Sequence, residues 1–376
     1  MKHLCKELSE DCWELILNQL AIDDLNHLQS PSLVCKLFLS ITDRLRLKLN
    51  VPNRLFYSHN CEGLFRALQR FTNLQEIELR DPIFGDKADV NYPLRRIASS
   101  GLDLQSLYLR SLQKSPFPKT FMKLGSTMNN LKILRCCCVK GFRNHHVVAI
   151  ADALPWLEEL DIQFSGYFWN LQDDLFTFEN SMIYATSLRS LVLEAKEDHD
   201  RLLFHGLSNF LCGCPSLTHL TLCFNNFLTD NYVRDLCRYL PNLVSIKFNR
   251  CSNITTTTFF ILAKECPMHS EIGLPNIKPQ VEDDFNLELK GNYPIRSIRI
   301  IGFDLFLGTV CPNLQTLNLN GLLSLTTEGI GEILRCCSQI KHLIVDRTRD
   351  MVIFLEQFKT RRIKIGHGYN LEGLYD

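Results

Sequence analysis

The fold is decided by an eight-residue stretch that returns along the chain. It reads PSLTHLTL at residues 215–222, PNLVSIKF at residues 241–248 and PNLQTLNL at residues 312–319. The copies share the apolar pattern L-x-x-L-x-L. In an extended chain alternate side chains point to opposite faces, so the apolar residues of this pattern gather on one face. The pattern therefore predicts a short strand with one buried face.

Copies of this stretch recur along most of the chain. Their first apolar position, here called the register position, recurs after 26 residues in five of ten intervals and after 19–31 residues in the others. Leucine-rich repeats have about 20–29 residues, and one repeat must stack on its neighbours to bury its apolar face. The register positions are Leu74, Leu104, Leu131, Leu157, Leu188, Leu217, Leu243, His269, Ile295, Leu314 and Ile340.

The residues between the strands have helical spacing. After residue 248, for example, Phe259, Leu262 and Ala263 recur at the intervals of one helical face, and Pro267 ends the helix. We therefore predict an α/β fold, a leucine-rich-repeat solenoid of horseshoe type. Its parallel sheet forms the concave side, and its helices lie outside.

The composition excludes several classes of function. The chain has 376 residues, with 41 Lys and Arg against 41 Asp and Glu, so it lacks the basic excess of a nucleic-acid or anionic-membrane binder. No apolar run has the length of a membrane-spanning helix, and the first residues lack a signal core. We expect an intracellular protein of the cytoplasm, the nucleus or both. No nucleotide-binding, zinc-protease or serine-nucleophile motif is found, so we expect neither catalysis nor a cofactor.

The sixteen cysteines follow the repeat. Cys214, Cys266, Cys311 and Cys337 each stand three residues before a register position, which favours small buried packing groups over disulfides or ligands. The triplet at residues 136–138, with His145 and His146, is the alternative candidate for a metal site. Adjacent cysteines on a strand point to opposite faces, so too few of them converge, and we predict no metal.

Residues 4–48 precede the repeats and have helical spacing instead. Ser9 is a candidate cap for a first helix that runs to about Leu20, and Asp24 opens a short second one. Ser30 and Pro31 resemble the start of a third helix. That helix would carry Leu33, Val34, Leu37, Phe38 and Ile41.

This segment resembles an F-box. The residues that carry the resemblance are Leu8, Asp11, Ile16, Leu17, Leu20, Asp24, Leu25, Val34, Cys35, Lys36 and Phe38. Ser9 stands where the family usually has proline, and Phe38 where it usually has tryptophan. With the repeats behind it, the chain is similar to F-box/leucine-rich-repeat proteins of the cysteine-containing, plant-like subclass. We place a three-helix F-box at 1–48 and a solenoid of about eleven repeats at 49–376.

The resemblance implies a substrate-recognition subunit of an SCF-type E3 ubiquitin ligase. The F-box would dock on a Skp-type adaptor, which joins cullin and RING subunits, and the repeats would hold the protein to be ubiquitinated. The residues expected at the adaptor are Leu8, Ile16, Leu17, Leu20, Leu25, Val34 and Cys35. The sequence leaves open whether each contacts the adaptor or fills the F-box core, and the same holds for Trp13. The alternative is a non-ligase interaction scaffold whose N-terminal helices only cap the solenoid.

Substrate contacts are expected on the concave face, at the outward positions of the strands. These are Tyr108, Arg110, Asp161, Gln163, Glu194, Lys247, Asn249, Arg299, Asn318 and Asp346. Their charges are mixed, and each is also compatible with an ordinary solvated strand position. Two irregular segments are further candidates for substrate contact, the aromatic-rich residues 166–178 and the acidic residues 275–292.

Overall fold

The computed structural model describes a large part of the chain and divides it into two compact units, Met1–Asp174 and Leu175–Asp376. The described residues are 8–23, 25–51, 61–80, 90–112, 116–137, 139, 144–163, 185–194, 207–266, 268–274, 294–300, 311–319, 327–345, 355 and 363–367. Each unit has its own parallel strands and helices, and each is described by itself.

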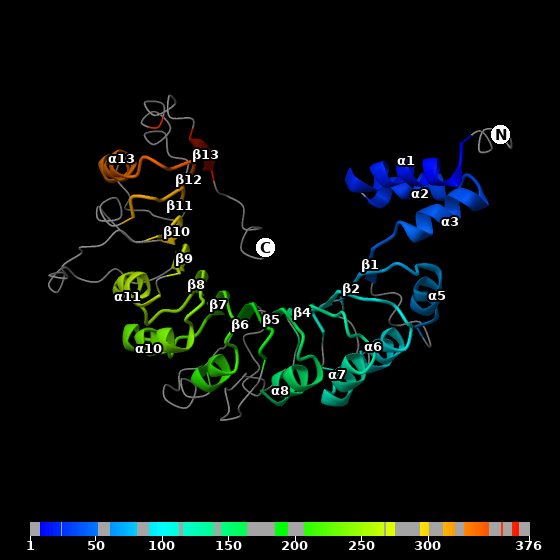
Figure 1. The fold of residues 1–376 in the computed structure, drawn as a ribbon, viewed down its shortest axis with the longest axis horizontal. Helices are drawn as coiled ribbons and strands as arrows, with labels where there is room; N and C mark the ends of the chain where they lie inside the picture. The colour runs from blue at the N-terminus through cyan, green and yellow to red at the C-terminus, as the bar shows by residue number, and fades with distance from the viewer. Residues whose placement is uncertain are drawn as a thin grey trace. The chain divides into compact units, whose positions relative to one another are not determined.

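The first unit begins with four short helical segments (Figure 1). They are α1 (Glu10–Asp23), the 3₁₀ helix η2 (Leu25–Leu28), α2 (Gln29–Ser32) and α3 (Lys36–Arg44). The predicted cap of the first helix is confirmed, because the Ser9 hydroxyl accepts a hydrogen bond from the backbone N–H of Cys12 at 3.4 Å.

The third predicted helix differs from the observed one. Pro31 lies inside the single turn of α2, and the chain then breaks before α3. The amides of Leu33 and Val34 bond the carbonyls three residues back, at 3.2 and 3.0 Å, which tightens and ends the turn. Cys35 is extended and begins α3. Leu33 and Val34 therefore lie in a turn and not on a helix.

These helices enclose a small hydrophobic core of their own. It consists of Leu17, Leu28, Phe38 and Ile41, with Trp13 packed against Phe38 at 4.7 Å between ring centroids. The cluster joins α1, η2 and α3, so each short helix gains from packing a stability that it would lack alone.

Parallel strands in chain order continue the first unit. Helices cover one face of the strands, and no described helix lies on the other face (Figure 1). The strands are β1 (Lys48–Val51), β2 (Glu76–Arg80), β3 (Ser106–Arg110), β4 (Ile133–Cys137) and β5 (Glu159–Gln163). The helices are α5 (Glu62–Arg70), α6 (Asn91–Ala98), α7 (Pro118–Gly125) and α8 (Asn144–Ala153).

The second unit repeats this arrangement, again with parallel strands in chain order. Its strands are β6 (Ser190–Glu194), β7 (His219–Cys223), β8 (Ser245–Asn249), β9 (Glu271–Leu274), β10 (Ser297–Ile300), β11 (Thr316–Asn318), β12 (His342–Val345) and β13 (Lys364–His367). Its helices are α10 (Asp230–Leu236), the 3₁₀ helix η4 (Cys237–Tyr239), α11 (Thr257–Glu265) and α13 (Thr327–Cys336), and residues 207–212 are also helical.

The predicted leucine-rich-repeat fold is confirmed. Each of the eleven register positions lies two residues before a strand, from Leu74 before β2 to Ile340 before β12. The register side chains are buried, and even His269 is only 1% exposed. The alternation along each strand sends the next apolar side chains into the same core.

Buried and partly buried polar groups tie neighbouring repeats together on the helix side. Asn91, at the start of α6, accepts hydrogen bonds from the Phe117 amide at 2.6 Å and the Thr120 hydroxyl at 2.7 Å, both from the next repeat. Asp230, at the start of α10, similarly accepts from the amide and hydroxyl of Thr255 at 3.0 and 2.7 Å. These bonds satisfy polar groups that burial would otherwise leave without partners.

The burial of the periodic cysteine side chains agrees with a packing role. Burial raises the pKa of Cys214 and of Cys311 to about 12, so both stay protonated near neutral pH. Among the described residues no two cysteines form a disulfide bond. The four periodic cysteines, Cys214, Cys266, Cys311 and Cys337, are all buried.

Gly125 offers a test of the packing between α7 and α8. A Cβ atom there would lie 2.0 Å from the backbone oxygen of Ala153. On an open helix, glycine to alanine stabilises by about 1 kcal/mol, but this clash should make Gly125→Ala destabilising by ~1–3 kcal/mol. The comparison is Gly273→Ala, whose near contact is a movable Lys247 side chain. Urea unfolding measures both, and a Gly125→Ala protein at least as stable as the parent would contradict the packing.

Candidate protein-binding surfaces

The N-terminal helices expose an unusual number of apolar side chains. In the described part of the chain twelve large hydrophobic side chains are exposed, and six of them belong to residues 8–34. Single exposed leucines are ordinary, but a concentration on one small element marks a contact surface. We call these six residues the apolar helix surface: Leu8, Leu15, Ile16, Leu20, Leu33 and Val34.

The structure separates the two roles that the sequence left open for the adaptor-binding set. Leu8, Ile16, Leu20 and Val34 are exposed and available for contact. Leu17 is 2% exposed and belongs to the core, which is one of the two roles that the sequence left open for it.

The remaining members are less exposed or less well described. Cys35 is half-buried and packs against the core, and Trp13 packs there too and is not an exposed anchor. The backbone of Leu25 lies in η2, and its side chain is outside the described residues. Leu15 and Leu33 were missed, because neither matches the F-box pattern. Leu15 could have been found as an apolar side chain that the helical core spacing does not use, whereas Leu33 was counted in the apolar spacing of the predicted third helix.

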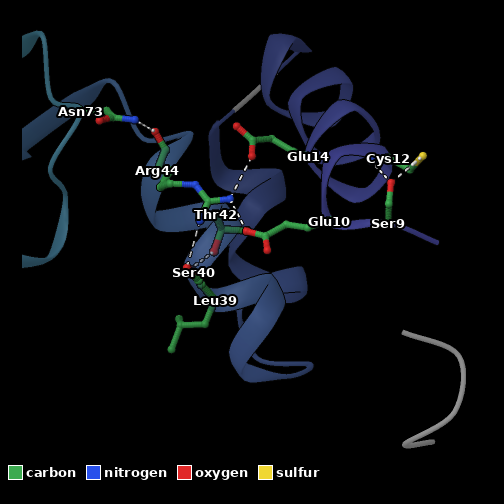
Figure 2. Close-up of polar contacts among 9 residues, drawn as sticks. All are labelled: Ser9, Glu10, Cys12, Glu14, Leu39, Ser40, Thr42, Arg44 and Asn73. Carbon is green, nitrogen blue, oxygen red and sulfur yellow. Dashed lines mark hydrogen bonds and ion pairs between the residues drawn. The ribbon is translucent and has the colours of Figure 1, made fainter. Parts of the chain in front are cut away.

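An arginine holds the two longer N-terminal helices together. Arg44 of α3 contacts Glu10 and Glu14 of α1 through Nη2, at 2.6 and 2.9 Å (Figure 2). It also donates to the Ser40 hydroxyl at 3.2 Å. The hydrogen bonds that Arg44 donates to Glu14 and Glu10 raise the pKa of Arg44. Because the groups are largely exposed, each pair adds little stability, and their effect is to fix the orientation of α1 on α3.

Polar contacts also attach α3 to the first repeat. The Asn73 side chain donates to the Arg44 carbonyl at 3.1 Å (Figure 2), and Arg70 pairs with Asp43 at 2.7 Å. The hydrogen bond that Arg70 donates to Asp43 raises the pKa of Arg70. The Leu47 carbonyl then accepts from the amides that lead into β2, at 2.8 and 3.0 Å. The helices that carry the apolar helix surface are thus attached to the first repeat by these polar contacts.

The strand face of the first unit carries a cluster centred on Tyr108. Glu78 and Arg135 are its register neighbours on β2 and β4, and Arg110 follows it two residues later on β3. The Arg135 guanidinium lies 5.2 Å from the centre of the Tyr108 ring. Tyr108 and Arg110 were predicted at outward positions, whereas Glu78 and Arg135 were missed although they occupy the same position of their repeats.

In the second unit, Lys247 and Asn249 also lie at outward positions. Lys247 pairs with Glu271 at 3.3 Å, and Glu271 accepts a hydrogen bond from Ser245 at 2.6 Å. Burial would raise the pKa of Glu271, but these two partners more than offset it and the pKa is lowered. Asn249 donates to the sulfur of Cys223 at 3.5 Å.

Several other predicted contacts have a different status. Asp161 and Glu194 occupy outward positions, yet they are 7% and 5% exposed, so the expectation of solvent-facing contacts is corrected for both. Asn318 is half-exposed at the outward position of β11. The described residues do not include the side chains of Gln163 and Arg299. They also leave out Asp346 and the segments 166–178 and 275–292.

The described residues contain no group of three His, Cys, Asp or Glu side chains placed to hold a metal. Cys136 is buried, and the loss of solvent raises its pKa well above the usual thiol value. The side chain of His145 is outside the described set, and His146 is buried.

None of the helices described is both long and apolar enough to cross a membrane.

Comparison with known proteins adds little to this geometry. No family model matches the chain. A solved structure that resembles it is the crystal structure of the Rad7 and Elc1 complex in yeast, with 15% sequence identity and a TM-score of 0.48. The match covers 90% of this chain and 88% of that chain. A likeness at this level carries no functional conclusion.

The division between core and surface in α1 can be tested with two leucines. Leu17→Ala removes a core side chain and should destabilise the helices by ~2–5 kcal/mol, whereas the exposed Leu15→Ala should change their stability by less than about 0.5 kcal/mol. Hydrogen exchange of the amides in α1 and α3 measures this local stability. Equal effects of the two substitutions would refute the assignment.

Proposed function

We propose that this chain is the substrate-recognition subunit of an SCF-type ubiquitin ligase. The N-terminal helices dock on a Skp-type adaptor, which links the chain to cullin and RING subunits, and the repeats hold the protein to be ubiquitinated. The chain itself is a non-catalytic receptor, and it acts in the cytoplasm or the nucleus. Its partners are proteins, with no nucleic acid or membrane among them.

The observation that carries the proposal is the apolar helix surface. Interfaces that bind proteins tightly have an apolar centre surrounded by polar groups. Ile16 and Leu20 lie one turn apart on α1, and Val34 lies in the turn before α3. These side chains are exposed to water in the isolated chain. An adaptor that covered them would remove their apolar surface from water, and this burial would favour binding.

The same observation argues against the scaffold alternative. A terminal cap is expected to keep a polar outer face, because its purpose is to shield the end of the solenoid from solvent. The N-terminal helices do contact the first repeat, as the Asp43–Arg70 pair shows. They nevertheless leave Leu15, Ile16 and Leu33 exposed, which a cap alone does not require.

The attachment of the helices to the repeats suits a receptor. Ubiquitin transfer requires a lysine of the bound protein near the activated ubiquitin, so a receptor contributes by raising effective concentration. That contribution is lost when the two binding elements move independently. The contacts of Arg44 with α1, and of its carbonyl with Asn73, restrain such movement.

Adaptor docking is tested by placing charges on the apolar helix surface. Ile16→Asp with Leu20→Asp, and separately Val34→Asp, should weaken binding of a purified Skp-type adaptor by about thirtyfold or more, since an unpaired charge would be desolvated in the interface. Titration calorimetry measures the affinity. Because the three residues are exposed, the circular dichroism and melting temperature should stay those of the parent.

The matched control is Met122→Asp on α7, which places the same charge on an exposed apolar residue far along the chain from the surface. It should leave adaptor affinity unchanged. Full adaptor affinity in the folded Ile16→Asp/Leu20→Asp and Val34→Asp proteins would contradict the proposal. So would a parent protein that does not bind the adaptor, and that result would favour the scaffold.

A further inference from the structure

Three arginines surround Tyr108 on the strand face of the first unit. Arg110 lies on β3, as Tyr108 does. Arg80 on β2 is the register partner of Arg110, and Arg135 on β4 is the register partner of Tyr108. No helix of the described residues covers this face (Figure 1). We call Arg80, Arg110, Arg135 and Tyr108 the arginine–tyrosine surface.

Glutamates pair with the arginines of this surface. Glu78 Oε1 lies 3.5 Å from the Nε atoms of both Arg80 and Arg110, so two guanidinium groups share one carboxylate. Arg135 Nε is 2.7 Å from Glu159 Oε1. In each case the ion pair is made through Nε, and at Arg110 this atom is buried and has no hydrogen-bond partner among the described residues.

The acids are recessed and the bases are presented to solvent. The side chains of Glu78 and Glu159 are 17% and 24% exposed, whereas those of Arg80, Arg110 and Arg135 are 59%, 36% and 32% exposed. With the buried Asp161 included, three acids balance three bases. Net charge therefore does not define the surface. Its more exposed charged side chains do, and these are arginines, one of which lies against the Tyr108 ring.

This arrangement suits one kind of ligand. A guanidinium group offers parallel N–H donors that match the two oxygens of a carboxylate, and arginine with tyrosine is the composition of interface hot spots. Because the hydrogen bond to Glu159 already orders the Arg135 side chain, binding has fewer rotamers left to order at that residue. We propose that the arginine–tyrosine surface binds an acidic segment of a partner protein through its carboxylates. This inference names the substrate class for the repeat face of the proposed receptor, and it rests on that function.

The test uses the full chain and three synthetic fluorescent peptides of equal length, in which glycine alternates with glutamate, glutamine or phosphoserine. Fluorescence anisotropy should show binding of the glutamate peptide and none of the glutamine peptide. In Arg80→Gln/Arg110→Gln, affinity for the glutamate peptide should fall about tenfold or more, because two charge-assisted contacts are lost.

The matched control is Arg66→Gln/Arg238→Gln, which removes two charges from exposed helical or 3₁₀ positions. Its affinity for the glutamate peptide should stay within about twofold of the parent. An equal loss in the control would show unspecific charge attraction and overturn the proposal. No binding of the glutamate peptide, or binding of the phosphoserine peptide alone, would overturn it as well.

Adaptor binding, measured in the same proteins, separates this inference from the ligase proposal. Arg80→Gln/Arg110→Gln should bind the adaptor normally, and Ile16→Asp/Leu20→Asp should bind the glutamate peptide normally. If adaptor binding is absent while the peptide results hold, the ligase function fails and the acidic-segment site stands. If the adaptor binds but Arg80→Gln/Arg110→Gln leaves the affinity for the glutamate peptide unchanged, only the acidic-segment site fails.

Discussion

The structure depends on a repeat that cannot bury its own leucines. Each strand has one apolar face, and that face leaves water only when a neighbouring repeat stacks beside it with its strand in parallel register. Register neighbours such as Leu107 and Leu134 meet in this way and are fully buried. Buried hydrogen bonds between repeats, such as those of Asn91, then fix the stacking that the leucines drive. The outward residues are free of this constraint, which leaves their chemistry available for recognition.

The same constraint explains the N-terminal end. The first repeat needs a neighbour, and β1 provides one by pairing with β2. The preceding helices have a core around Phe38 and Ile41, so they are stable without covering the repeats completely. Their remaining apolar residues are exposed, and the proposed receptor uses this exposed surface to join another protein. Asp43 and Arg44 connect these helices to the first repeat through an ion pair with Arg70 and a hydrogen bond with Asn73.

The sequence predicted the repeats well because their signal is periodic. Every register position stands two residues before a strand, including the degenerate His269. Strands β1 and β13 were not predicted, because neither carries the full apolar pattern and both form by pairing with a neighbour. The start of the third helix was misplaced, because Ser30 and Pro31 fit a helix start equally well whether the helix has one turn or three.

The candidate surfaces were predicted only in part. Helical spacing alone could not distinguish Leu17, which fills the core, from its exposed neighbour Ile16, because the direction of the core depends on how α3 packs. Strand alternation placed Tyr108 and Arg110 outward but could not show that Glu78 bridges Arg80 and Arg110 from the adjacent strand. Burial of Asp161 and Glu194 at outward positions likewise depends on neighbours that lie far away in sequence.

The central claim is that the apolar helix surface is covered by an adaptor. Hydrogen exchange of the whole chain, with and without a purified Skp-type adaptor, tests it most directly. The proposal predicts slower exchange in α1 and in the turn before α3, around Ile16, Leu20 and Val34, with the strands of both units unchanged. Unchanged exchange in these helices at saturating adaptor, or protection confined to the strands, would contradict it.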